Sequence, residues 1–206
     1  AKMMVVDPGD RLWAPISRQR PEDLQLSAAS LDLIRRSYFF RPVPEVRRVV
    51  FIATPHGGSF LTEFAVTRLL SRLITLPLSV AEASAEVLSG NADAVMLNLQ
   101  GARLGSLNGM TPGSPFIRSL RALPLAPGVT GNSIIAVRGD GPPESGSDGV
   151  VRFESAHLPD MESELVVRSG HSTQNNPQTI SEVRRLLLLH WRNACPTMRR
   201  DKKGAC

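Results

Sequence analysis

One segment, residues 46–53, constrains the fold of this chain more than any other feature. It reads Val-Arg-Arg-Val-Val-Phe-Ile-Ala, and its second half is continuously apolar and mostly β-branched or aromatic. Such a run is typical of a strand in a parallel sheet that is buried on both faces. It ends at a loop of mostly small residues, Thr54-Pro55-His56-Gly57-Gly58-Ser59. We therefore predict a buried parallel strand, followed by a loop at its carboxyl end.

Two later segments, 132–137 and 163–167, have the same strand character. Helical patterns lie before the first strand, at 21–40, and after the last strand, at 178–191. Strands that alternate with helices predict an α/β fold with a mostly parallel sheet flanked by helices. Three strands are few for such a sheet, so we expect the chain to be the second half of one.

The helix boundaries follow from local chemistry. Ala1–Val6 has the pattern of a helix end, because Asp7-Pro8-Gly9 follows it. Ser27 or Ser30 is suited to cap the helix within 21–40. The last helix begins after Pro177. Its expected apolar stripe consists of Ile180, Val183, Leu186, Leu187 and His190.

Residues 60–122 are rich in Leu and Ala and lack clear strands. Helical periodicity predicts helices near 64–74, 80–88, 92–104 and 116–120. A helical segment of this length is long for a simple crossover between two strands. We therefore expect 60–122 to be an inserted cap or lid, and 1–59 with 123–195 to form the core.

The charge of the chain is concentrated in its tail. Its 206 residues include 24 Lys and Arg against 19 Asp and Glu, which gives a net charge of +5. The basic segment 196–206 contributes four positive charges and one negative charge. A solvated tail explains this pattern, and the sequence pI of about 10 is the only feature that favours a nucleic-acid partner. Aromatic residues make up 5% of the chain, which disfavours base-stacking surfaces.

The sequence contains no pattern that predicts a metal or a cofactor. The four histidines lie in separate segments without the spacing of zinc ligands. There is no glycine-rich nucleotide fingerprint or Walker A motif. The two cysteines, Cys195 and Cys206, lie in or beside the tail and form no disulfide framework. We expect neither a metal nor a cofactor.

An acid and a base follow two successive strands. Asp148 comes after the second strand and His171 after the third, 23 residues later. The carboxyl ends of parallel strands lie at one edge of a sheet, so the two side chains can meet there. A carboxylate in that position orients an imidazole, which can then accept a proton from a nucleophile. Two alternatives remain: Asp148 as a simple turn former, and Asp140 as the acid.

Three motifs in chain order carry a resemblance to a known family. They are 49–59 (VVFIATPHGGS), 147–151 (SDGVV) and 163–172 (SELVVRSGHS). Together they resemble bacterial lipase- and esterase-like α/β-hydrolases, over nearly the whole chain from Ala1 to about His190. In that family the triad runs Ser, then Asp or Glu, then His. The resemblance implies that Asp148 is the acid and His171 the base, and that 54–59 follows the sixth strand of the family's sheet.

The nucleophile motif G-x-S-x-G of that family is absent from this sequence. Windows that begin at Gly57, Gly131 and Gly170 each lack the final glycine. The resemblance places the serine elbow and the oxyanion donors upstream of Ala1. Ser147 and Ser172 lack an elbow, so we do not expect either to be the nucleophile.

The resemblance implies a serine hydrolase that acts on carboxylic esters (EC 3.1.1 type), with a small-molecule or lipid ester as substrate. We expect the chain alone to be inactive. Any membrane association would come from the segment before Ala1. The alternatives are a non-catalytic hydrolase-like binding protein or inactive fragment, and a basic nucleic-acid-associated protein. We expect His56 to structure its loop through a ring hydrogen bond to the backbone, and His157 to be a loop residue or a contact near the site.

Overall fold

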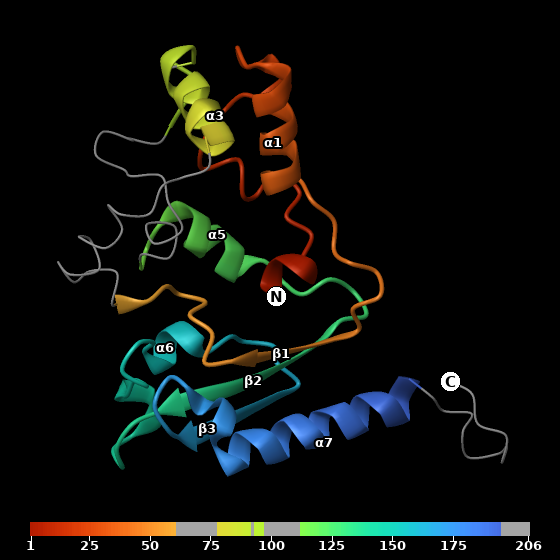
Figure 1. Ribbon diagram of the computed structural model, residues 1–206, viewed down its shortest axis with the longest axis vertical. Coiled ribbons are helices and arrows are strands. Elements are labelled where there is room, and N and C mark those ends of the chain that lie inside the picture. Colours follow the sequence, from red (N-terminus) through yellow and green to blue (C-terminus); the bar gives the residue numbers. More distant parts are fainter. Residues whose placement is uncertain (61–77, 92, 97–111, 195–206) are drawn as a thin grey trace, which may run out of the picture.

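The computed structural model describes residues 1–60, 78–91, 93–96 and 112–194. Its centre is a parallel sheet of three strands in the order β1-β2-β3 (Figure 1). The strands are β1 (Arg48–Ile52), β2 (Thr130–Val137) and β3 (Ser163–Arg168). All three carboxyl ends therefore lie at one edge of the sheet. This arrangement confirms the predicted α/β class and the parallel pairing.

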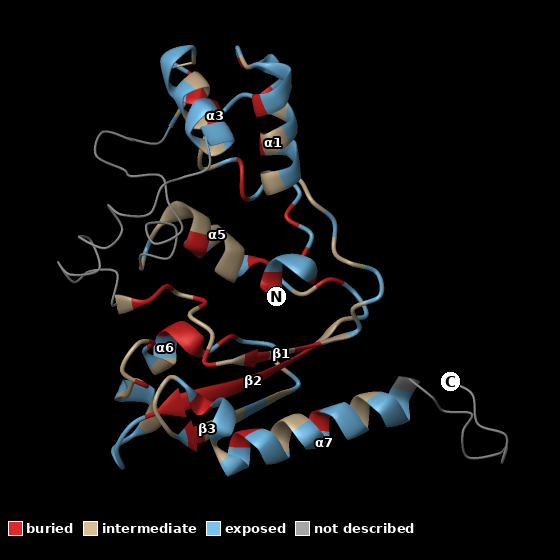
Figure 2. Cartoon of the chain, viewed as in Figure 1, coloured by how far each residue is buried: buried red, intermediate tan, exposed pale blue. Residues whose placement is uncertain are grey.

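Helices cover both faces of the sheet. Helix α7 (Pro177–Ala194) lies along one face (Figure 1). Its residue Val183 packs on Ile134, Ala136 and Val167. Helices α5 (Pro115–Ala122) and α6 (Phe153–Ala156) lie on the other side. Figure 2 shows β2 as almost wholly buried, which fits its central position. The remaining short 3-10 turns are η1 (Lys2–Met4), η2 (Pro21–Asp23), η4 (Pro143–Ser145) and η5 (Thr173–Asn175).

Strand β1 pairs on one side only. Within the described part of the chain its single partner is β2. Val49 and Phe51 are buried beneath Val5 and Leu158, whereas Val50 and Ile52, on the α7 face, are half-buried. The expectation that β1 is buried on both faces therefore holds for one face, and the other is covered only in part.

The first helix is shorter than the sequence pattern predicted. Residues 21–23 form the separate turn η2, and helix α1 covers Ala28–Tyr38. Ser27 caps α1, because its hydroxyl accepts a hydrogen bond from the amide of Ser30. Helix α3 (Leu78–Ser89) packs against α1, where Val87 joins a cluster with Trp13 and Ile34.

The structure tests only part of the expected helical insertion. Helices α3 and α5 confirm the helices expected at 80–88 and 116–120. Residues 93–96 form a turn that ends in a β-bridge between Val95 and Ser17, so the helix expected over 92–104 is absent there. The expected helix at 64–74, the rest of 92–104 and the tail at 196–206 lie outside the described residues. The lid role of 60–122 stays a prediction.

The two chain ends of the core also differ from the expected patterns. The helix end expected at Ala1–Val6 is the single 3-10 turn η1. In α7 the predicted stripe is wrong in part: Leu186 is buried, but Ile180 and Leu187 are 53% and 62% exposed. Thr179, which was not in the predicted stripe, is buried, and its hydroxyl shares a hydrogen bond with that of Thr173.

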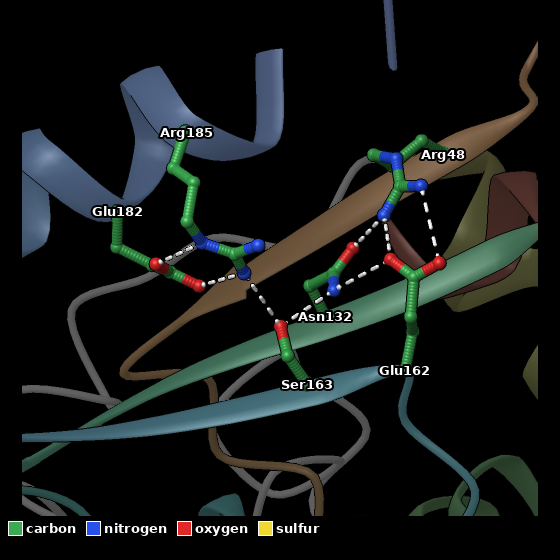
Figure 3. A network of polar contacts seen from close by, with 6 residues as sticks. All are labelled: Arg48, Asn132, Glu162, Ser163, Glu182 and Arg185. Atoms are coloured by element: carbon green, nitrogen blue, oxygen red, sulfur yellow. Dashed lines mark hydrogen bonds and ion pairs between the residues drawn. The ribbon is translucent and has the colours of Figure 1, made fainter. Parts of the chain in front are cut away.

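A polar network joins the amino ends of the three strands to α7 (Figure 3). Its central residue is the fully buried Asn132 of β2, which accepts from Arg48 and donates to Ser163 and Glu162. Arg48 also pairs with Glu162, and its hydrogen bond lowers the pKa of that carboxyl. Arg185 of α7 extends the network to Ser163. These contacts fix the strand register at the edge opposite Asp148 and His171.

Candidate active site

Asp148 and His171 meet at the carboxyl edge of the sheet. The ring Nδ1 of His171 lies 2.8 Å from Oδ2 of Asp148. The Asp148 side chain is 1% exposed, whereas that of His171 is 40% exposed. The carboxylate is therefore enclosed by the protein, and part of the imidazole faces solvent. The sequence placed these two residues at one edge, and the structure brings them into hydrogen-bond contact.

A tight turn holds the carboxylate in position. The amides of Val150 and Val151 both donate to Oδ1 of Asp148, at 2.8 and 2.7 Å. The amide of His171 donates to the Asp148 carbonyl at 3.1 Å. Oδ1 is thus occupied by the backbone and Oδ2 is directed to the imidazole. In the tautomer with its proton on Nδ1, the ring of His171 donates to Oδ2 and leaves Nε2 as the acceptor.

This geometry bears on the alternatives for the acid. Asp148 does form a turn, but its second oxygen also binds the imidazole, so a turn-forming role does not account for the whole arrangement. Asp140 is exposed, and in the described residues it makes no hydrogen bond or ion pair with His171. The structure brings His171 together with Asp148 and not with Asp140.

The loop after β1 lies against the turn of Asp148. It begins at Ala53, a buried non-glycine residue with a φ of 46°, a strained conformation that is common at functional sites. The hydroxyl of Ser59 donates to the carbonyl of Val150 at 2.8 Å. Gly57 is bound by Ser155 of α6 through both its carbonyl and its hydroxyl. No pattern along the chain predicts this role of Ser155, because Ser155 lies 98 residues from Gly57.

His56 structures this loop in a different way from the one expected. Its ring packs edge-on against Phe51 at 4.5 Å, and its buried Nε2 has no partner among the described residues. The expected ring hydrogen bond to the backbone is therefore wrong for Nε2. Burial, and then the positive charges of Lys2 and Arg121, lower the pKa of His56 to about 3. His56 is a neutral packing residue at physiological pH.

The other candidate residues lie away from the imidazole contact. His157 follows α6, stacks on Phe153 and binds Glu164 through Nδ1 at 2.8 Å. Ser172 is exposed, and Ser147 forms a β-bridge with Arg152. Within the described residues no hydroxyl hydrogen-bonds the ring of His171. The nucleophile therefore has no candidate in this part of the chain.

Two hollows lie beside the loop after β1. The smaller, of about 190 Å³, is lined by Gly57, Gly58, Arg121 and Ser155. The larger, of about 510 Å³, is lined by residues 144–147. They share Phe60, Arg152 and Glu154. A hollow of about 710 Å³ lies among the N-terminal segment and α1, and no residue of the acid–base pair lines it. Asp148 and His171 do not line the two hollows beside the loop either, although Ser147, which precedes Asp148, lines the larger of them.

The described residues contain no group of three or more side chains that could hold a metal ion. Among the helices in the described ranges, none is both long and apolar enough to cross a membrane. No protein-family model, no curated protein and no solved structure matches this chain. What the structure shows is an α/β fold with a hydrogen-bonded pair of Asp148 and His171 at the carboxyl edge of its sheet.

Proposed function

We propose that this chain supplies the acid and base of a serine hydrolase that acts on carboxylic esters. The observation that carries the proposal is the 2.8 Å contact between the buried Asp148 and the half-exposed His171, with Oδ1 held by two backbone amides. Such a pair fixes the imidazole tautomer and stabilises its protonated form. The resemblance of 49–59, 147–151 and 163–172 to lipase- and esterase-like α/β-hydrolases supports ester hydrolysis.

In this mechanism the nucleophile is a serine upstream of Ala1. Nε2 of His171 accepts the serine proton as the oxygen attacks the ester carbonyl, and then returns it to the leaving alcohol. A water molecule repeats the sequence on the acyl-enzyme, which releases the acid and restores the serine. Asp148 holds the ring and balances its transient positive charge. The loop after β1, which is fixed by Ser155, borders the space in which the ester reacts.

Serine-reactive labelling tests the division of roles. The 206-residue chain alone should not react with a fluorophosphonate, because no serine hydroxyl in the described residues hydrogen-bonds the ring of His171. A longer protein that carries a G-x-S-x-G serine upstream should react at that serine. Stoichiometric labelling of Ser147 or Ser172 in the short chain would contradict the proposed upstream nucleophile.

Ester hydrolysis by the longer protein tests the base. His171→Ala should lower kcat for a short-chain nitrophenyl ester by a factor on the order of 10⁴–10⁶. The matched control is His157→Ala, which removes a histidine that also binds a carboxylate but lies outside the proposed site. Equal losses in the two variants would reject His171 as the base. A longer protein with no serine elbow and no turnover would instead favour a hydrolase-like binding protein.

A further inference from the structure

Arg138 has an unusual position beside the acid–base pair. It directly follows β2, and its amide donates to the carbonyl of Ser147 at 2.8 Å, so its backbone is fixed next to the turn of Asp148. The residue itself is exposed. Its side chain lies across two glycines: Gly149, which follows Asp148, and Gly170, which precedes His171.

The two glycines provide the space that the guanidinium occupies. A Cβ atom at Gly149 would lie 2.6 Å from Cζ and Nη1 of Arg138, and Gly149 has a φ of +96°. A Cβ atom at Gly170 would lie 3.2 Å from Nη2. Real Cβ atoms do not approach a guanidinium at the first of these distances. The guanidinium therefore lies directly against the backbone of Gly149, next to Asp148, and of Gly170, next to His171.

The guanidinium of Arg138 donates no hydrogen bond to any residue in the described part of the chain. Other arginines near the sheet edge have acceptors: Arg168 binds the carbonyls of Gly139 and Gly141, and Arg121 binds those of Glu154 and His157. Those two arginines hold loops together. Arg138 is exposed instead, and its guanidinium lies beside Gly170, the residue that precedes His171.

We propose that Arg138 is a specificity-determining residue that binds an anionic oxygen group, a carboxylate or a phosphate, on the molecule that reacts at His171. A guanidinium forms paired hydrogen bonds with such groups, and it remains charged at every physiological pH. Asp148 does not hold it, because no hydrogen bond or ion pair joins Arg138 to Asp148 in the described residues. Anion binding by Arg138 is independent of the proposed function. The inference rests on that function only where it takes the anion to be part of the substrate.

Anion binding is measurable on the 206-residue chain itself. In NMR titrations with inorganic phosphate and with succinate, at constant ionic strength, the amide signals of Gly149 and Gly170 should shift and saturate. Arg138→Gln should weaken this binding about tenfold, the effect expected for loss of a charge-assisted contact. The matched control is Arg192→Gln, which removes the same charge from an exposed position in the last turn of α7.

A second variant tests the geometry and retains the charge. Gly170→Ala places a methyl group 3.2 Å from Nη2 and so displaces the guanidinium by a few tenths of an ångström. Its affinity for phosphate should lie between those of the wild type and Arg138→Gln. Equal affinity in the wild type and Arg138→Gln, or shifts at Gly149 and Gly170 that do not saturate, would overturn the proposal.

Kinetics of the longer protein distinguish a substrate anion from a free anion. The ratio of kcat/KM for a hemisuccinate ester to that for the acetate ester of the same alcohol should fall about tenfold in Arg138→Gln, mainly through KM. The ratio should be unchanged in Arg192→Gln. An unchanged ratio in Arg138→Gln, despite lost phosphate binding, would overturn the substrate role. Absence of any ester turnover would reject the proposed function, whereas the titration would still decide whether Arg138 binds anions.

Discussion

The hydroxyl of Ser155 joins two glycines of the loop after β1: it donates to the carbonyl of Gly58 at 2.6 Å and lies 3.0 Å from the amide of Gly57, which donates to it. Ser155 is 7% exposed. One buried side chain on α6 thus determines where the loop lies relative to the turn of Asp148.

Replacement of Ser155 should therefore weaken both stability and activity. Ser155→Ala leaves a buried carbonyl without its donor, so the free energy of unfolding should fall by roughly 1–3 kcal/mol, measured by urea denaturation. Ser145→Ala is the control, because the Ser145 hydroxyl binds the carbonyl of Pro142 at an exposed position. Its effect should stay within about 0.5 kcal/mol. Equal effects of the two variants would show that Ser155 does not anchor the loop.

Isosteric substitution distinguishes the two candidates for the acid, Asp148 and Asp140. In the longer protein, Asp148→Asn should lower kcat for ester hydrolysis by roughly 10⁴, because the amide favours the wrong imidazole tautomer. Asp140→Asn should leave kcat within about twofold, because Asp140 is exposed and makes no contact with His171 in the described residues. Steady-state rates for both variants check this ranking. A larger loss in Asp140→Asn would reassign the acid.

Burial of neutral His56 predicts how stability depends on pH. Its pKa is lowered from 6.5 to about 3 in the folded chain, mainly by burial, with Lys2 and Arg121 adding to the effect. The unfolded chain binds a proton below pH 6.5 while the folded chain does not. Stability is therefore present above pH 6.5 and is lost as the pH falls toward 3, by up to about 1.4 kcal/mol per pH unit from this residue.

Urea denaturation at pH values between 7 and 4 measures this dependence. His56→Gln removes the titrating group and should make the loss of stability on acidification shallower. His157→Gln is the control, because the His157 side chain is 47% exposed. If the two variants and the wild type lose stability in parallel, the buried ring is not the source of the acid sensitivity.

The polar network at the other edge of the sheet should be a major determinant of stability. Asn132→Ala removes an acceptor of Arg48 and a donor to Ser163 in a fully buried site, so it should cost roughly 2–4 kcal/mol in urea denaturation. Asp32→Asn breaks the exposed pair of Asp32 with Arg36 on α1 and should cost less than about 0.5 kcal/mol. A small loss in Asn132→Ala would show that the network is not needed for the strand register.

Local patterns explain which elements were predictable. β2 and β3 and the pairing of Asp148 with His171 follow from apolar runs and from the geometry of parallel sheets, and both are local or topological rules. Helix α1 begins at Ala28 because Ser27 caps it, whereas the apolar spacing alone extended it back to Pro21. Capping chemistry was a better guide to the helix start than periodicity.

Contacts between distant residues were not predictable. Asn132 lies 84 residues after Arg48 and 30 residues before Glu162 along the chain. Nothing in the local sequence of these residues predicts that they are partners. The position of Arg138 depends on two glycines whose lack of a side chain matters only once the turns are folded. The same holds for His56, whose neutral state results from the burial that the tertiary fold imposes.

The half-covered strand β1 has a consequence for how the sheet is completed. Along its open side the amides and carbonyls of alternate residues have no partner strand in the described residues, and Val50 and Ile52 beside them are uncharged and half-buried. No lysine, proline or bulge within β1 blocks the approach of another strand. We expect a further strand of the sheet to pair along this open side, because three strands are few for a sheet of this class.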